Sequence, residues 1–191
     1  MTPTRIMTYE IDTQHSSAQF KVRHMMIANV KGEFDRVRGT VFFDPANLVA
    51  TRVAAVIDVA SISTREPDRD THLKGPDFFD VAKFPEITFR SEGAVESGDG
   101  YRVTGDLTIH GISKQVTLDV ESVASEIKDP WGLMRRGLSA STRIDRRDFG
   151  LVFNMPLDGG GVVVGDKIEI TLDVEMTRSA SEAAVSEAKR A

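Results

Sequence analysis

Apolar and polar residues alternate along most of this chain, and this alternation restricts the possible fold more than any other feature of the sequence. The cleanest run extends from 168 to 176, where Ile, Leu, Val and Met alternate with charged or hydroxyl-bearing residues. A strand turns successive side chains to opposite faces, so such a run predicts one apolar and one polar face. The same pattern recurs over 18–24, 53–59, 101–109 and 115–121. We therefore expect an all-β chain with antiparallel strands that are wetted on one side.

Short segments rich in Gly, Pro, Asn and Asp separate the alternating runs, at 44–47, 97–100, 110–113 and 158–161. These residue types tolerate tight or left-handed backbone, and their spacing predicts about eight strands joined as hairpins. A barrel would cover the apolar face and remove the sheet edges by closing on itself. A sandwich would explain the alternation equally well, so the pattern leaves both architectures open.

Two stretches depart from the β pattern. Residues 66–74 are strongly polar, with Pro67 near the start and Gly75-Pro76 after the end, which predicts a short helix. The segment 179–191 is rich in Ala, Ser, Glu and Lys and is expected to be a flexible tail. Residues 1–8 are interpreted as an N-terminal extension, which leaves 9–178 as one domain.

Composition and charge exclude several classes of function. The 191 residues carry a net charge of -5, and the basic residues are scattered, which argues against a nucleic-acid partner. The densest basic cluster, 135–136 and 143–147, alternates with acidic and apolar residues and is interpreted as a solvated strand face instead of a polyanion site. There is no cysteine, so disulfides, thiolate zinc sites and cysteine nucleophiles are ruled out. No signal-peptide pattern or membrane-spanning run is visible, so a cytoplasmic protein without stable membrane insertion is expected.

No motif of metal binding or catalysis stands out. The four histidines (15, 24, 72 and 110) form no i, i+4 pair, and Asp68, Asp70 and His72 are better interpreted as a solvated helix face than as a metal site. The segment 137–141 resembles a nucleophile elbow but ends in Ser instead of Gly and lies in an alternating run. Gly159 to Gly161 are not followed by the Lys-Ser/Thr pair of a phosphate loop. We expect no catalytic residue and no metal, although carboxylates are too plentiful to exclude a general acid and base.

The aromatic residues are almost purely hydrocarbon, with ten Phe against two Tyr and one Trp. They gather within 78–89 and 149–153. Core packing is the simpler explanation for any single Phe, but for the whole set a ligand cavity becomes a competing interpretation. The interior of an eight-stranded barrel is just wide enough to be filled by side chains or to hold one slim ligand.

A series of short motifs occurs in a fixed order from Tyr9 to Thr177. They are YEID (9–12), HS (15–16), FKVRH (20–24), GEF (32–34), HLKGPDFFDV (72–81), FPEITF (84–89), GDLTIHG (105–111), KQV (114–116) and RRDFG (146–150). With these motifs the chain resembles the YceI-like family of lipocalin-like, polyisoprenoid-binding proteins. It departs from the family at Tyr9, where relatives commonly have Trp, and in lacking the secretion signal that many relatives carry.

The resemblance implies an extended antiparallel eight-stranded β-barrel with a short helix near one end. It also implies a long apolar pore for an isoprenoid lipid, either a polyprenyl chain or a quinone-like molecule, in a carrier, storage or sequestration protein that is often a homodimer. The lipid would be a ligand, with no other cofactor, and no catalytic residues are carried over. The expected lining comprises Phe20, Val22, Phe34, Ile57, Phe78, Phe79, Phe84, Phe89, Leu107, Ile109, Phe149, Phe153 and Leu172.

Two histidines are candidates to contact the head group of such a lipid at the barrel mouth. His24 ends a predicted strand, and His72 lies on the predicted helix. Two other functions remain open. An enzyme acting on a lipid would need titratable groups inside the barrel, where His24 alone breaks the apolar pattern. A ligand-free interaction module would need a filled core and a large exposed apolar patch.

Overall fold

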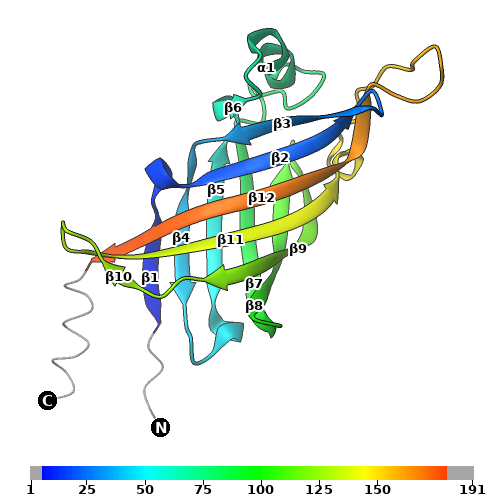
Figure 1. Ribbon diagram of the computed structural model, residues 1–191. Coiled ribbons are helices and arrows are strands. Elements are labelled where there is room, and N and C mark those ends of the chain that lie inside the picture. The colour runs from blue at the N-terminus through cyan, green and yellow to red at the C-terminus, as the bar shows by residue number, and fades with distance from the viewer. Residues whose placement is uncertain (1–5, 180–191) are drawn as a thin grey trace, which may run out of the picture.

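The computed structural model describes residues 6–179, and this part of the chain consists almost entirely of antiparallel strands (Figure 1). One α-helix is present in it, α1 (Pro67–Lys74). The strands are β1 (Met7–Ile11), β2 (Ser17–His24), β3 (Ala28–Phe34), β4 (Val37–Phe43), β5 (Arg52–Asp58), β6 (Ile62–Ser63), β7 (Glu86–Ser97), β8 (Gly100–Ile109), β9 (Ile112–Val123), β10 (Ile127–Lys128), β11 (Leu133–Asp145) and β12 (Val164–Ser179).

Eight of these strands close into a barrel. The ring runs β1, β4, β5, β7, β8, β9, β11 and β12, and it closes where β12 pairs with β1 at Ile11 and Met176. β11 provides the other essential link, because it pairs with β12 along its whole length and with β9 on its other edge. The expected eight-stranded antiparallel barrel is thereby confirmed, and the sandwich that alternation alone left open is excluded.

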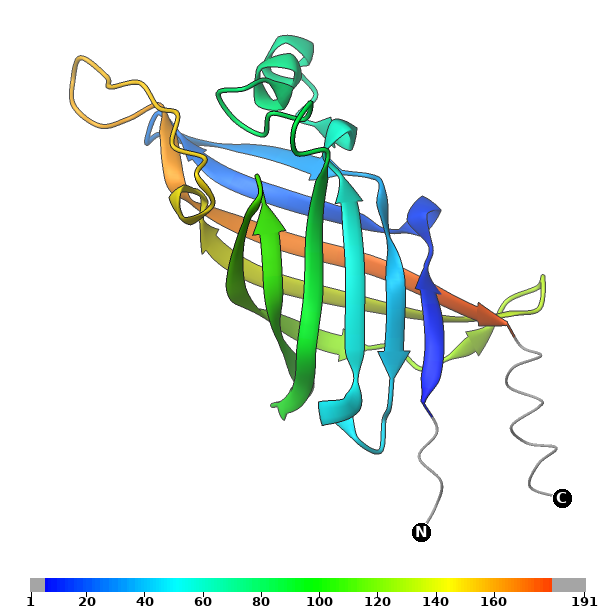
Figure 2. The same ribbon diagram turned by 180° about the vertical axis from the view of Figure 1, so that it is seen from behind.

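The barrel wall is extended on one side by the β2–β3 hairpin. β12 is long enough to pair with β1 near its C-terminal end and with β2 along its first half, so the hairpin continues the wall beyond β1 and β4. Figures 1 and 2 show that the hairpin tip, the loop over 150–163 and α1 project on the same side of the molecule. The β10–β11 hairpin and the β4–β5 connection lie at the opposite end.

The short helix follows from its local sequence. Pro67 occupies the first turn, and the Glu66 carboxylate caps the helix by accepting hydrogen bonds from the backbone amides of Asp68 and Arg69. Gly75 follows the last helical residue. The helix expected over 66–74 is confirmed, and it begins at Pro67 because Glu66 serves as its cap.

The ends of the described chain belong to the barrel. Met7 and Thr8, assigned from sequence to the N-terminal extension, pair with Phe43 and Phe42 in β4. Ser179 ends β12 opposite Leu133. The remaining expectations for the extension (1–5) and for the tail (180–191) lie outside the described residues. Across 6–179, no helix has the length and apolar character needed to cross a membrane.

Candidate ligand cavity

A cavity of about 250 Å³ lies inside the barrel, and the surface that its wall exposes is entirely apolar. The wall consists mainly of the inward-facing residues of the ring strands and of β2 and β3. Segments outside the strands complete it, with Leu73 of α1, the Phe78-Phe79 pair, and Arg146, Phe149 and Leu151 after β11. Alternation along each strand explains this composition, since every second residue turns toward the barrel axis.

Many inward-facing side chains are only half-buried, and this identifies the interior as hollow. On β5, Val53, Ala55 and Ile57 all line the cavity, yet none is fully buried. On β12, Ile168 and Ile170 show the same combination. A packed core would bury such residues almost completely. Their partial exposure arises because they face empty space inside the barrel.

Eleven of the thirteen side chains expected in the lining lie in the cavity wall. They are Phe20, Val22, Phe34, Ile57, Phe78, Phe79, Phe89, Leu107, Ile109, Phe149 and Leu172. Several other wall residues were not among those expected, for example Val53, Ala55, Ile168 and Ile170. The alternation of apolar and polar residues could have identified them, because each belongs to an alternating run.

Phe84 and Phe153 lie outside the wall, and both assignments are corrected. Phe84 precedes β7 and packs against His110, with 4.4 Å between the ring centroids. Phe153 lies in the loop before β12 and packs against His72 and Phe78, each at 5.1 Å. Neither residue is in a strand, so the inward and outward alternation does not apply to them.

A cluster of aromatic rings covers the cavity on the side of α1. The rings of His72, Phe78 and Phe153 lie within 5.1 Å of one another, and Phe78 belongs to the cavity wall. His72 is exposed, and its Nε2 lies 3.0 Å from a carboxylate oxygen of Asp77. His24 ends β2 opposite Val164, another wall residue. Both histidines thus lie beside one end of the cavity, and neither forms part of its wall.

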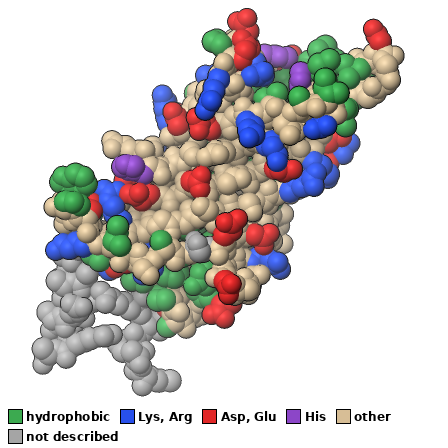
Figure 3. All heavy atoms as spheres, viewed as in Figure 1, with side chains coloured by type: hydrophobic (Ala, Val, Ile, Leu, Met, Phe, Trp, Pro, Cys, Tyr) green, Lys and Arg blue, Asp and Glu red, His purple; other side chains and the backbone are tan. Residues whose placement is uncertain are grey.

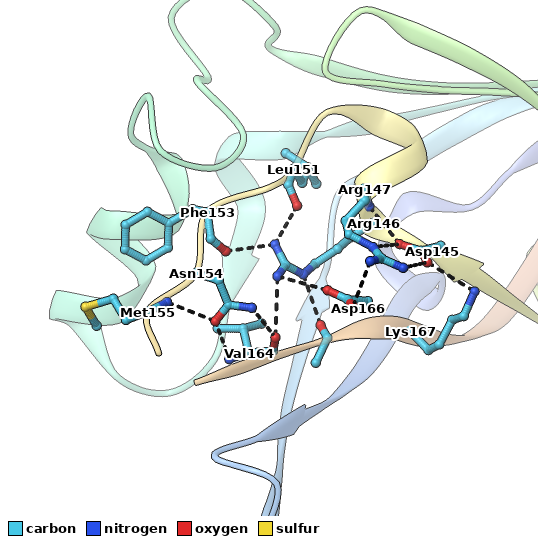
Figure 4. A network of polar contacts seen from close by, with 11 residues as sticks. Asp145, Arg146, Arg147, Leu151, Phe153, Asn154, Met155, Val164, Asp166 and Lys167 are labelled. Atoms are coloured by element: carbon cyan, nitrogen blue, oxygen red, sulfur yellow. Dashed lines mark hydrogen bonds and ion pairs between the residues drawn. The ribbon is translucent and has the colours of Figure 1, made fainter. Parts of the chain in front are cut away.

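Arg146 ties the loop over 151–163 to the barrel at this same end (Figure 4). Its side chain is 4% exposed. Its guanidinium donates hydrogen bonds to the carbonyls of Gly165 at 3.0 Å, Phe153 at 2.9 Å and Leu151. Burial lowers the pKa of Arg146, and the nearby carboxylates of Asp166 and Asp145 oppose that shift. The guanidinium therefore acts as a buried clamp on the loop backbone.

The environment of Arg146 corrects the interpretation of 143–147 as a solvated face. β11 ends at Asp145, and the short 3-10 turn Arg146–Phe149 then directs Arg146 inward. Asp145 is also buried, and its carboxylate accepts hydrogen bonds from Arg147 at 2.6 Å and pairs with Lys167 at 3.1 Å. The hydrogen bonds from Arg147 hold the pKa of Asp145 well below its usual range.

A polar cluster fills the opposite end of the barrel. Tyr9 is fully buried, and its hydroxyl donates to Glu126 at 2.6 Å while accepting from Arg136 at 2.9 Å. Arg178 donates two further hydrogen bonds to the Glu126 carboxylate. Burial and the contact with Glu126 raise the pKa of Tyr9. The cavity wall begins at Ile11, the next inward residue of β1, so the cavity ends at this cluster.

One group of three potential metal ligands lies on the barrel exterior. Side-chain atoms of Asp12, His15 and Glu175 lie within 4.8 Å of one another. Arg135 donates to Asp12 at 2.7 Å and also to Glu175, so the two carboxylates already pair with one guanidinium. The arrangement is that of an ion-pair cluster centred on arginine. It joins β11, β12 and the segment after β1.

The cavity offers few groups for chemistry. Among the wall residues in the described part of the chain, Arg146 carries the one ionisable side chain, and it is bonded to backbone carbonyls. The fold and cavity define a class of protein: a closed, lipocalin-like antiparallel barrel with an apolar interior cavity.

Comparison with known proteins places the chain within that class. The YceI-like domain matches residues 9–176, and the chain belongs to the YceI-like family. A UPF0312 protein of Vibrio cholerae is 38% identical over 146 residues, which cover 75% of this chain and 77% of the relative. The crystal structure of Burkholderia cenocepacia BcnA superposes with a TM-score of 0.75 at 26% identity, covering 86% of this chain and 98% of BcnA.

A more distant structure shares the fold. It is a polyisoprenoid binding domain from Saccharophagus degradans, with a TM-score of 0.62 at 15% identity. The match covers 88% of this chain and 97% of that domain. At this identity the similarity concerns the arrangement of the strands.

Proposed function

We propose that this protein binds the isoprenoid chain of a lipid inside the barrel and acts as a carrier, storage or sequestration protein. The observation that carries the proposal is the cavity inside the barrel, whose exposed wall is entirely apolar. The polar cluster around Tyr9 at one end and the aromatic cover at the other restrict the ligand to the barrel interior. The description of the Saccharophagus domain as polyisoprenoid-binding supports the choice of ligand by analogy of fold.

The energetics favour such a ligand without any charged contact. Burial of hydrocarbon contributes about 0.8 kcal/mol per CH2, so one five-carbon isoprene unit contributes up to about 4 kcal/mol. A few units would give tight binding even after the cost of immobilising the chain.

The polar head group would lie on the α1 side of the barrel, beside His24 and His72. This hypothesis follows from position, because Val164 and Phe78 connect these histidines to the cavity wall. It predicts that His24→Ala and His72→Ala weaken binding of geranylgeranyl diphosphate more than binding of geranylgeraniol. Equal affinities in the variants and the unaltered protein, measured by calorimetry, would remove both histidines from the proposal. If the head group is a quinone, the same comparison of the variants with the unaltered protein is made with a short-chain ubiquinone.

Organic-solvent extraction of the purified protein, followed by mass spectrometry, tests the proposed ligand. We expect a prenyl lipid at a substantial fraction of the protein concentration. Extracts without lipid, together with no measurable binding of added geranylgeraniol, would contradict the proposal. A lipid-acting enzyme would convert the added ligand, which the same mass spectra would detect.

Homodimer formation and a cytoplasmic location stay predictions. Size-exclusion chromatography with light scattering measures the first. Fractionation of cells expressing the full chain measures the second.

A further inference from the structure

Five large apolar side chains are exposed together at one end of the barrel. They lie on the β2–β3 turn and on the loop between the Arg146–Phe149 turn and β12, and each is between 41% and 78% exposed. We call this group the apolar tip; it comprises Met25, Met26, Ile27, Val152 and Met155. Figure 3 shows hydrophobic side chains gathered at the end of the molecule where these two segments project. A contiguous group of this kind marks an interaction surface.

The two segments are joined into one surface. The Met25 amide donates a hydrogen bond to the carbonyl of Val163 at 2.7 Å. A Cβ added at Gly161 would lie 3.4 Å from Cγ of Met26, so the tip of the hairpin lies directly against the loop. Arg146 holds the same loop to the barrel through its backbone carbonyls.

The conformation of the β2–β3 turn is unusual for its residues. Met25 and Met26 have φ of 49° and 61°, in the left-handed region, and the Ile27 amide closes the turn on the carbonyl of His24. Asn and Gly are the residues that suit two successive left-handed positions in a hairpin. The backbone of a methionine is strained in this conformation, so the stability of the turn does not explain why Met25 and Met26 occur there. Their presence at the exposed tip points to a binding role.

Two cations lie on the hairpin that carries the apolar tip. Arg23 and Lys31 are exposed on the outer face of the hairpin, and neither has a carboxylate within ion-pair distance among residues 6–179. The guanidinium of Arg23 lies at the turn itself, where it donates to the carbonyl of Met26 at 2.9 Å. Asp158 is an exposed acid on the neighbouring loop. Apolar side chains backed by unpaired cations match the surface of an anionic bilayer.

A second copy of the chain fits this surface less well. Two tips meeting head to head would bring Arg23 and Lys31 of both copies together, and like charges in such a contact disfavour it. The whole chain has a net charge of -5, so attraction to an anionic surface depends on this end of the molecule.

The apolar tip is continuous with the cavity. Val22, Leu151 and Val164 belong to the cavity wall. Val22 and Leu151 lie within three residues of the tip along the chain, and Val164 pairs with His24, which precedes Met25. Contact of the tip with a bilayer would therefore bring the covered end of the cavity to the lipid surface.

We propose that the apolar tip docks the protein on anionic lipid bilayers by inserting its methionine and isoleucine side chains below the head groups. The docking proposal is based on the apolar tip and its cations. A role of docking in loading or unloading a lipid rests on the proposed function.

Co-sedimentation with vesicles tests docking directly. We expect the full-length protein to bind vesicles of phosphatidylcholine and phosphatidylglycerol more strongly than vesicles of phosphatidylcholine alone, and to lose that difference in high salt. The double variant Met25→Asn/Met26→Gly suits the turn, so it should fold with an equal or higher Tm and bind at least about tenfold more weakly. Unchanged vesicle binding in this variant would overturn the proposal.

A matched pair of single substitutions controls for general surface hydrophobicity. Ile27 is 78% exposed in the tip, and Val49 is 64% exposed in the β4–β5 connection at the opposite end. Ile27→Asn should weaken vesicle binding by about tenfold, whereas Val49→Asn should leave it unchanged. Equal losses in both variants would contradict docking through the tip. Conversion of a dimer to a monomer by Ile27→Asn, with vesicle binding unaffected, would instead identify the tip as an interface between copies.

The single tryptophan of the chain reports on the other end of the molecule. Trp131 is 82% exposed in the β10–β11 hairpin, away from the tip (Figure 1). Docking through the tip should leave its emission maximum unchanged on vesicle addition, and a blue shift would place the membrane contact at Trp131 instead. All of these measurements use lipid-free protein without isoprenoid. Docking and isoprenoid binding are therefore measured separately. A variant that no longer docks on vesicles should still bind geranylgeraniol, and a protein that does not bind geranylgeraniol should still dock.

Discussion

Substitution of Ala55 by Leu would fill part of the cavity with protein. Ala55 lies in the middle of β5, between Gly39 of β4 and Phe89 of β7, and its side chain lines the cavity while remaining half-buried. Leu adds three carbon atoms at a position that faces empty space. At about 0.8 kcal/mol per buried CH2, the free energy of unfolding of the ligand-free protein should rise by up to about 2.4 kcal/mol.

The same substitution should weaken ligand binding. Three carbons of protein displace a similar amount of the ligand chain, so the binding free energy should fall by about 2.4 kcal/mol, which is about a 50-fold increase in Kd. Urea denaturation measures the first effect, and calorimetric titration with geranylgeraniol measures the second. The opposite signs of the two effects distinguish a filled cavity from a damaged fold.

Ala54 provides the control within the same strand. It lies next to Ala55 but on the outer face, outside the cavity wall. Ala54→Leu should change the Kd for geranylgeraniol by less than about twofold, because the added carbons lie outside the cavity. The free energy of unfolding should change by only about 0.5 kcal/mol, as for other surface substitutions. If Ala55→Leu and Ala54→Leu left binding equally unchanged, the ligand would not occupy the cavity and the reasoning would be refuted.

Three further substitutions test the surroundings of the cavity. Leu107→Asp should destabilise the protein by at least about 3 kcal/mol in urea denaturation, because it removes a buried side chain and places a carboxyl in an apolar wall; unchanged stability would place Leu107 outside the wall. Arg146→Met should cost about 3 kcal/mol and accelerate hydrogen exchange over 151–163, because the loop carbonyls lose a buried donor; unaltered exchange would show that the clamp is dispensable. Asp145 has a lowered pKa, so its stabilising contribution is complete above the ordinary value of 3.8 and is lost as the pH falls below it. Asp145→Asn should therefore reduce stability at neutral pH and flatten its decline in acid, and parallel pH profiles of the two proteins would contradict this.

The alternation of apolar and polar residues predicted β2, β5, β8, β9 and β12, but it did not predict every strand or how the strands close. The run over 168–176 defined which face of β12 points inward, and it contained no information about a partner on either edge. Closure depends on pairings between distant segments, such as Ile11 with Met176. A single sequence does not encode such pairings in any local pattern, and the expectation of closure came from the resemblance to a barrel family.

The site was predictable where the strand rule applied. Phe20, Leu107 and Leu172 lie in strands and reach the cavity wall as their alternation requires. Phe84 and Phe153 lie in irregular segments, where backbone direction determines the position of a side chain. Arg146 illustrates the same limit, because a turn that follows β11 converts an expected surface residue into a buried clamp.

The dependence of affinity on the length of a prenyl alcohol is the direct test of isoprenoid binding inside the barrel. Calorimetric titration of the lipid-free protein with geraniol, farnesol and geranylgeraniol should give affinities that rise steeply with each added isoprene unit until the cavity is filled, because the wall exposes only apolar surface. Affinities that do not change with chain length, or no binding of any of the three, would contradict a barrel that holds an isoprenoid chain.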